Sequence, residues 1–373
     1  MVVSLEVDGL TASSVEKPAG AEALARRLKE AAGDGQAVIP VGGRRALGLG
    51  DPPERFDLAL DTTGLDRIIE HSVPDMVVTV EAGVSLERLN EELGRSGQYL
   101  PLDPYGAPGH TVGGAIAAAL SGPLRLRYGM ARDYLIGLRV ALPDGRLAAS
   151  GGRVVKNVSG YDMNKLHHGA LGSLGVIVAA SFKLFPKPLH EVTLRTEASD
   201  QASAWGEARR ALALPMEPIS LVLRSGPGGT ELFARLAGTR AAVELMATEL
   251  GWAEREDMWA KHSGLGSASW ARVSVPPTRL AEHATALPEG AEYVALPGVG
   301  ALHWLNATDA AAIRPVRERA EAAGGSLTLI AAAPELKRQI GAWGTPPATL
   351  EVMRSLKRSF DPGRVLSPGR FVV

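Results

Sequence analysis

The chain has 373 residues, 45% of them hydrophobic, and a formal net charge of −1, which indicates an ordinary globular protein long enough for two domains. The near-neutral charge gives no reason to expect a nucleic acid or a broad anionic surface as a partner, and cysteine is absent, which excludes disulfides, thiol catalysis and an iron–sulfur cluster ligated by this chain alone. No apolar run reaches the roughly eighteen residues of a membrane span, and the acidic N-terminal residues differ from a signal peptide, so a cytoplasmic protein is expected.

The first half of the sequence alternates predicted helices with predicted strands. The 3.6-residue spacing of apolar side chains predicts a helix over 18–32 and another that starts at its N-cap, Ser85. Short apolar runs predict strands over 37–39, 58–60, 76–82 and 176–184. The turn sequence Pro143-Asp144-Gly145 predicts a β-hairpin over 137–149.

The pattern resets after the prolines of 186–188. Strands are predicted over 191–195, 219–224 and 232–236, and helices over 201–212 and 239–250. This order is typical of a split β-α-β sheet with its helices on one face. A last helix, over 348–360, ends at Asp361-Pro362-Gly363.

Three glycine-rich segments stand out, and the first is PVGGRRALGLGD, residues 40–51, directly behind a predicted strand. Its spacing fits neither a nucleotide P-loop, since no Lys follows, nor a Rossmann fingerprint, since Asp51-Pro52-Pro53 prevents a helix in that register. A glycine-rich turn without a ligand and a phosphate-holding loop both remain open for this segment alone. The second segment is Thr111-Val112-Gly113-Gly114, and the third covers 169–175. Small residues let a backbone lie close against a ligand, so three such segments favour a ligand.

The order of these motifs resembles the FAD-binding oxidoreductases of the vanillyl-alcohol oxidase (PCMH) type. In that family a Pro-x-Gly-Gly-Gly loop holds the FAD pyrophosphate, a Gly-Gly…Gly segment lies beside the flavin ring, and a Gly-Ser-x-Gly-Thr-Leu-Gly-Val-Ile run touches the adenine end. Phe360-Asp361-Pro362-Gly363 and Ser367-Pro368-Gly369-Arg370 are similar to the family's closing motif. Carried over to this sequence, the expected FAD-binding residues are Pro40, Val41, Gly42, Gly43, Arg44, Arg45, Pro108, Gly109, Thr111, Val112, Gly113, Gly114, Ser121, Gly122, Tyr128, Gly129, Asp133, Gly160, Tyr161, Asp162, Gly172, Gly175, Val176 and Ile177.

The resemblance implies an α+β fold in three parts. These are a two-subdomain PCMH-type FAD-binding domain (1–188), a ferredoxin-like cap or substrate domain (189–334) and a C-terminal segment (335–373) that returns to the FAD domain. Because no Cys exists and no His lies in 40–50, the FAD is expected to be non-covalent.

Within the family, the chain is most similar to the smaller flavin subunits of bacterial glycolate oxidases. That similarity implies assembly with a larger homologous flavin subunit and an iron–sulfur subunit, with any contact to the inner membrane made through those partners. Three functions therefore remain open: an FAD-dependent enzyme that oxidises glycolate or another short 2-hydroxy acid, a flavin-carrying electron-transfer or assembly subunit whose partner does the chemistry, and a protein whose glycine loops are only turns.

Oxidation of a 2-hydroxy acid requires cationic groups for its carboxylate and a base for its hydroxyl proton. Arg suits the first task because its guanidinium binds both carboxylate oxygens. The candidates are Arg272, His303 and Arg370, although for each of them an exposed charge is the more usual role. His167 and His168 are expected at the surface or at a helix N-cap, and the scattered His residues show no metal-ligand spacing.

Overall fold

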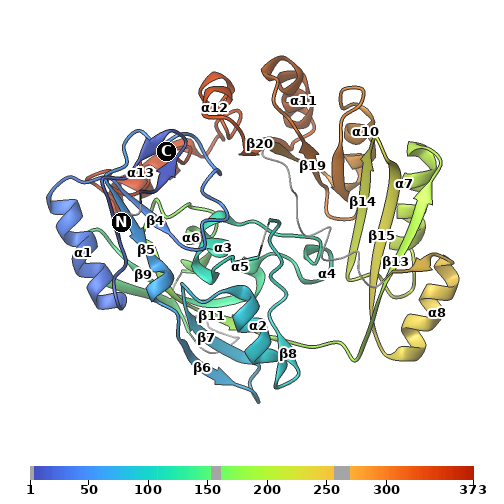
Figure 1. Ribbon diagram of the computed structural model, residues 1–373, viewed down its shortest axis with the longest axis horizontal. Coiled ribbons are helices and arrows are strands. Elements are labelled where there is room, and N and C mark those ends of the chain that lie inside the picture. The colour runs from blue at the N-terminus through green and yellow to red at the C-terminus, as the bar shows by residue number, and fades with distance from the viewer. Residues whose placement is uncertain (1–3, 107, 153–160, 256–268) are drawn as a thin grey trace. The chain divides into compact units, whose positions relative to one another are not determined.

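A computed structural model describes residues 4–106, 108–152, 161–255 and 269–373 of the chain (Figure 1). The chain divides into two compact units, each of which mixes helices and sheets, so the fold class is α+β. Unit 1 comprises residues 1–120, 130–187 and 346–373, and unit 2 comprises 121–129 and 188–345. None of the described helices combines the length and the apolar composition needed to cross a bilayer.

One half of unit 1 is a small parallel sheet. Its strands are β3 (Ser14–Glu16), β5 (Leu58–Asp61) and β4 (Val38–Val41), in that order. Helix α1 (Ala21–Gly33) packs Leu24 and Leu28 into the same buried cluster as Val38 and Leu60. The cluster also contains Val365 and Leu366, so the C-terminal segment is part of this core.

The other half of unit 1 is an antiparallel sheet in the order β10-β9-β11-β7-β6. The bounds are β6 (Ile68–Ser72), β7 (Val77–Glu81), β9 (Leu135–Ala141), β10 (Leu147–Gly151) and β11 (Val176–Lys183). Strands β9 and β10 pair antiparallel from Leu147↔Ala141 onward, which confirms the predicted hairpin. Helices α2 (Leu86–Gly94) and α3 (Val112–Ala118) share the sheet's apolar core, and Ser85 caps α2 by accepting a hydrogen bond from the Arg88 amide.

The remaining elements of unit 1 are short, except for the C-terminal helix. They are β1 (Glu6–Val7), β2 (Leu10–Thr11), a 3-10 turn (Thr62–Gly64), β8 (Gln98–Tyr99), α5 (Ala131–Tyr134), α6 (Asn164–His167), β12 (Phe185–Pro186) and α13 (Leu350–Phe360).

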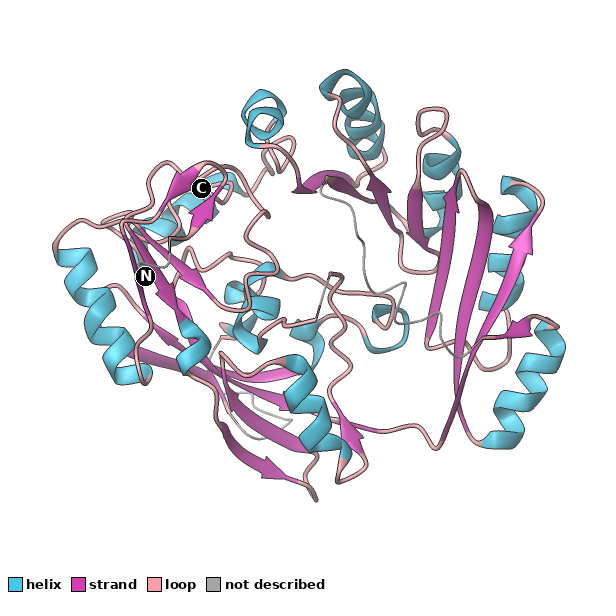
Figure 2. Cartoon of the chain, viewed as in Figure 1, coloured by secondary structure: helices cyan, strands magenta, loops and turns pink. Residues whose placement is uncertain are grey.

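Unit 2 is built on an eight-stranded antiparallel sheet in the order β16-β13-β15-β14-β18-β19-β17-β20. Figure 2 draws the strands in magenta and the helices in cyan. Its strands are β13 (His190–Ala198), β14 (Ser220–Gly226), β15 (Gly229–Gly238), β16 (Ala253–Glu254), β17 (Trp270–Ser274), β18 (Tyr293–Leu296), β19 (Ala301–Leu305) and β20 (Ser326–Ala331). Its helices are α4 (Arg125–Tyr128), α7 (Gln201–Leu212), α8 (Arg240–Leu250), a 3-10 turn (Pro277–Arg279), α10 (Leu280–Thr285), α11 (Ala310–Ala322) and α12 (Pro334–Ile340). Apolar side chains of α7, α8, α10 and α11 join one face of the sheet in a single buried core, as the split β-α-β pattern predicts.

The second glycine segment is helical, which the sequence did not predict. Val112, Gly113 and Gly114 form the first turn of α3. Thr111 makes this possible because its hydroxyl accepts a hydrogen bond from the Gly114 amide, which replaces a bond that the helix cannot make at its start.

Candidate functional site

A pocket in unit 1 is lined by residues from each of the three glycine-rich segments. Its walls come from the loop after β4, from α3, from the loop before β11 and from the C-terminal segment. The lining residues are Pro40, Val41, Gly42, Gly43, Arg44, Arg45, Ala46, Leu47, Thr62, His110, Thr111, Gly113, Gly114, Ala117, Ala118, Leu171, Gly172, Val176, Ile177 and Arg370.

The loop after β4 needs its glycines because other backbone lies against it. A Cβ on Gly43 would sit 1.8 Å from the Gly109 carbonyl oxygen, and one on Gly42 would sit 2.2 Å from the Thr111 hydroxyl oxygen. Thr111 also accepts a hydrogen bond from the Gly43 amide at 3.3 Å. The first and second glycine segments are therefore held together, and side chains at 42 and 43 would push them apart.

The loop before β11 closes the pocket from another side. Leu171 and Gly172 both have positive φ angles, 50° and 70°, and a Cβ on Gly172 would lie 2.9 Å from the Pro40 side chain. Arg44, on the opposing loop, also has a φ of 60°, a conformation that residues other than glycine seldom adopt. Left-handed residues of this kind cluster at ligand sites, where surrounding contacts stabilise them.

The charged residues that line the pocket are all cationic. Arg44 and Arg45 are exposed, Arg370 is 4% exposed, and no Asp or Glu is among the lining residues. Arg44 has Asp61 as an ion-pair partner at 3.6 Å. Burial lowers the pKa of His110, which lies in the wall with its Nε2 against the Tyr105 carbonyl oxygen. A narrow, glycine-walled pocket with cationic side chains fits an extended ligand that carries a diphosphate, such as FAD.

Some expected FAD-binding residues lie beside or outside this pocket. Pro108, Gly109, Val112 and Gly175 flank it in the sequence, whereas Ser121, Gly122, Tyr128 and Gly129 belong to unit 2. Asp133 accepts a hydrogen bond from the Met130 amide at the start of α5, Tyr161 is 92% exposed, and Asp162 pairs with Lys165 at 2.9 Å. Gly160 lies outside the described residues. For these residues a role in FAD binding stays a prediction.

Other lining residues were not anticipated from the sequence. They are Ala46, Leu47, Thr62, His110, Ala117, Ala118, Leu171 and Arg370. Ala117 and Ala118 follow Gly114 in α3, so recognition of the helix would have found them. Arg370 was expected beside the substrate, but its side chain is in the wall of this pocket.

Arg272 and His303 lie together in unit 2. They are cross-strand neighbours on β17 and β19, and Ala271, Val273, Leu302 and Trp304, the residues on either side of them, point into the helix-covered core. Because side chains alternate along a strand, Arg272 and His303 point to the other face of the sheet. The His303 ring also lies 5.1 Å from the Trp270 ring.

Arg125, on the short helix α4, adds a second cation to this cluster. Burial lowers the pKa of Arg272 to about 10, and the charge of Arg125 acts in the same direction. Burial also lowers the pKa of His303 to about 3, with smaller contributions from Arg272 and Arg125. At neutral pH the cluster thus contains two guanidinium cations and an uncharged imidazole, and the Nε of Arg272 has no hydrogen-bond partner within the described part of the chain.

The prediction of a surface position for His167 is wrong. His167 is 4% exposed, its ring lies 6.0 Å from the Phe360 ring, and burial lowers its pKa to about 4. Across the described ranges, His, Asp and Glu side chains do not gather in threes that could hold a metal ion.

Comparison with known proteins adds independent information about the chain. Residues 12–151 match the family model described as an FAD binding domain. The chain is 30% identical over 368 residues to the glycolate oxidase subunit GlcE of Escherichia coli, which covers 94% of this chain and 96% of that protein. It is 34% identical over 157 residues to the glycolate oxidase subunit GlcD of Bacillus subtilis and 36% identical over 155 residues to the mitochondrial D-lactate dehydrogenase of Arabidopsis thaliana. These two matches each cover 42% of this chain but only 33% and 27% of the respective relatives.

A solved structure of alkyldihydroxyacetonephosphate synthase has the same fold. It superposes with a TM-score of 0.68 over 98% of this chain and 78% of the synthase chain, at 15% sequence identity. Identity this low supports the shared fold alone.

Proposed function

Because the chain belongs to the FAD-binding oxidoreductases of the vanillyl-alcohol oxidase (PCMH) type, the family that includes the glycolate oxidase subunit GlcE, we propose that it is the FAD-binding subunit of a complex that oxidises a short 2-hydroxy acid, glycolate to glyoxylate. FAD, when bound, accepts the two electrons and the hydrogen that leave the carbinol carbon. The glycine-walled pocket of unit 1 supplies the cofactor site.

The observation that carries the substrate class is the cluster of Arg125, Arg272 and His303. A carboxylate is the common feature of all 2-hydroxy acids, and guanidinium groups bind it through paired, charge-assisted hydrogen bonds. Two buried or partly buried cations next to a neutral imidazole therefore suit a small carboxylate. Arg125 follows Ala118 of the FAD pocket by seven residues in the sequence, so a short stretch of chain joins the cluster to the pocket.

A second candidate function is a flavin-carrying electron-transfer or assembly subunit whose partner does the chemistry. The low pKa of His303, about 3, favours it, because a general base works best when its pKa lies near the working pH. His303 can accept a hydrogen bond from the substrate hydroxyl, but it holds a proton weakly at neutral pH.

We propose a larger homologous flavoprotein subunit and a Cys-rich iron–sulfur subunit as the partners. Two of the relatives, GlcE and GlcD, are named as glycolate oxidase subunits, and this chain has no Cys to ligate a cluster. Electrons that leave its flavin for a metal cluster must therefore pass to another polypeptide.

An anaerobic assay with glycolate and D-lactate tests these proposals. The FAD-loaded chain is mixed with either acid, alone and as the complex purified with its partners, and the flavin absorbance is followed. We expect rapid bleaching by the complex and slow or no bleaching of the isolated chain. Rapid, full bleaching of the isolated chain would show a complete dehydrogenase, and an unreactive complex would contradict the substrate class.

The carboxylate site has its own test in the complex. Arg272→Met should raise KM for glycolate by roughly 10- to 100-fold, the equivalent of one lost hydrogen bond to a charged group, while FAD content stays unchanged. Arg279→Met, which removes an exposed cation paired with Glu282, is the matched control. An unchanged KM in Arg272→Met would exclude the cluster as the carboxylate site.

A further inference from the structure

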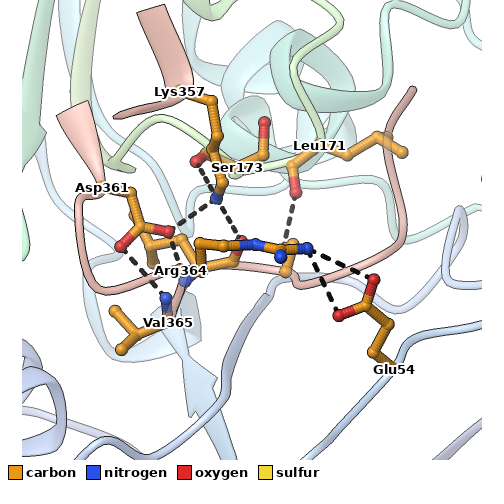
Figure 3. Close-up of polar contacts among 9 residues, drawn as sticks. Glu54, Leu171, Ser173, Lys357, Asp361, Arg364 and Val365 are labelled. Carbon is orange, nitrogen blue, oxygen red and sulfur yellow. Dashed lines mark hydrogen bonds and ion pairs between the residues drawn. The ribbon is translucent and has the colours of Figure 1, made fainter. Parts of the chain in front are cut away.

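The C-terminal segment that follows α13 is fixed by a buried ion pair (Figure 3). Lys357 Nζ donates hydrogen bonds to Asp361 Oδ2 at 2.6 Å and to the carbonyl oxygens of Ser173 and Leu366, both at 2.8 Å. The Lys357 ammonium thus uses all three of its protons, and one of them holds the loop before β11. Asp361, which is fully buried, also accepts hydrogen bonds from the Val365 and Leu366 amides.

The next residues of the segment lie between two walls of the FAD pocket. The Ser367 hydroxyl donates to the Leu171 carbonyl oxygen at 3.0 Å, and the Ser367 amide donates to the Val38 carbonyl oxygen at 2.8 Å. Val38 is in β4, which leads into the first glycine loop, and Leu171 itself lines the pocket. The segment therefore connects two loops that are more than 100 residues apart in the sequence.

Arg370 extends this connection to the first glycine loop. Its Nη2 donates to the carbonyl oxygens of both Leu47 and Leu49, and its own carbonyl oxygen accepts a hydrogen bond from the Asp51 amide at 3.1 Å. A Cβ on Gly50 would lie 2.4 Å from the Arg370 carbonyl oxygen, so the absence of a side chain at Gly50 lets the two chain segments approach each other. Arg370 thereby lies in the pocket wall next to the glycine loop.

The guanidinium of Arg370 is the buried cation of this pocket wall, whereas Arg44 and Arg45 are exposed. Burial lowers the pKa of Arg370 to about 10, and the charge of Asp8 opposes that change, so the side chain stays charged at neutral pH. A guanidinium binds phosphate oxygens through charge-assisted hydrogen bonds, and Arg370 places such a group in the wall of the pocket that suits a diphosphate.

We propose that Arg370 binds the diphosphate of FAD, so that the C-terminal segment is a working part of the cofactor site and not only part of the core. The assignment moves Arg370 from the substrate, where the sequence had suggested it, to the cofactor. It concerns cofactor affinity, so it can fail while the proposed hydroxy-acid oxidation stands.

The test compares two variants that separate charge from hydrogen bonding. Arg370→Lys keeps the positive charge, whereas Arg370→Gln keeps an amide donor for the loop carbonyls and loses the charge. The dissociation constants of FAD and of riboflavin, which has no phosphate, are measured for each apoprotein by flavin fluorescence, and folding is checked by urea unfolding. Arg364→Gln is the matched control, because Arg364 lies on the same segment but pairs with Glu54 at the exposed surface at 3.3 Å.

We expect Arg370→Gln to weaken FAD at least 10-fold and riboflavin less than 3-fold, and Arg370→Lys to bind FAD within about 5-fold of the native protein. Arg364→Gln should leave both ligands unchanged. Equal losses of FAD and riboflavin in Arg370→Gln, or unchanged FAD affinity, would overturn the proposal, since Arg370 would then act only by holding the loop. If Arg370→Gln does not fold, Arg370→Lys tests the proposal instead. A ratio of FAD affinity to riboflavin affinity equal to that of the native protein supports a role for the charge, and a much smaller ratio contradicts it.

Discussion

Gly113 and Gly114 are consecutive residues of α3, yet a methyl group on each would meet different surroundings. A Cβ on Gly113 would lie 2.7 Å from the Ala82 Cβ, inside the core of unit 1, whereas the nearest atom to a Cβ on Gly114 is the Thr111 hydroxyl oxygen at 3.1 Å. Neither residue has a positive φ, so backbone strain does not explain a need for glycine at these two positions. Their importance comes from space, and the two should respond differently to substitution.

Gly113→Ala should lower the free energy of unfolding of the apoprotein by about 1–3 kcal/mol, because it overpacks the contact with Ala82. Gly114→Ala should leave that free energy equal or raise it by up to about 1 kcal/mol, because Ala favours a helix. Its methyl group stands at the pocket wall, so it should weaken FAD binding. Urea unfolding and FAD titration measure both effects, and a stable Gly113→Ala protein would contradict the packing argument.

The buried imidazole of His167 predicts a loss of stability in mild acid. Its pKa is about 4 in the folded protein and about 6.5 in the unfolded chain, so between these values only the unfolded chain binds the proton. The free energy of unfolding should therefore fall as the pH decreases from about 6.5 toward 4, by up to about 3 kcal/mol, with no contribution above pH 7.

Urea unfolding at several pH values checks this contribution. His167→Leu should show a shallower decline in mild acid than the native protein, while His190→Leu, at a partly exposed position, should follow the native curve. Parallel curves for the native protein and His167→Leu would mean that His167 is not the group responsible.

Residue-level prediction from the sequence succeeded where the requirement was local. Gly42 and Gly43 predict that another part of the chain lies close to them, and in the structure they lie against Gly109 and Thr111. Arg370 could not be assigned in the same way, because the carbonyl groups that it contacts lie more than 300 residues away in the sequence. Only the folded chain shows that its guanidinium belongs to the pocket wall.

At the scale of elements, the end of α13 depends on the Lys357–Asp361 pair. Lys357→Met would leave the fully buried Asp361 carboxylate with backbone donors only, and it should lower the free energy of unfolding by about 3–5 kcal/mol. Arg354→Met, on the same helix, removes an exposed pair with Glu351 and should cost less than about 1 kcal/mol. Similar effects of the two substitutions in urea unfolding would contradict the importance of burial.

The sequence predicts the long, regular elements best. The predicted α1, α2, α7, α8 and α13 all appear, because each has a clear apolar face and a stop or a cap. The elements between Leu250 and α13 were not predicted, for physical reasons that the structure explains. Strand β17 has five residues with Arg272 at its centre, α10 has six residues, and α11 contains Pro315, which ordinarily breaks a helix.

At the scale of the whole molecule, every residue that lines the FAD pocket belongs to unit 1. FAD should therefore stabilise unit 1 directly, by about 2.7 kcal/mol at a free concentration one hundred times its dissociation constant. Differential scanning calorimetry with and without FAD measures this as a rise in melting temperature. The flavin should also separate from the acid-precipitated protein, since we predict a non-covalent cofactor; flavin retained in the pellet would instead point to His110, the histidine in the pocket wall.

The chain passes between the two units at four points, and residues 121–129 belong to unit 2 although both flanking segments belong to unit 1. Neither unit is therefore encoded by one continuous stretch of the gene. A chimera that imports residues 188–345 from a relative would still carry the native 121–129, including Arg125, against a foreign sheet. In a functional chimera of two relatives, residues 121–129 and 188–345 should therefore have to come from the same parent. A single crossover within 130–187 separates these two segments, so a library of such chimeras should contain few folded proteins that bind flavin.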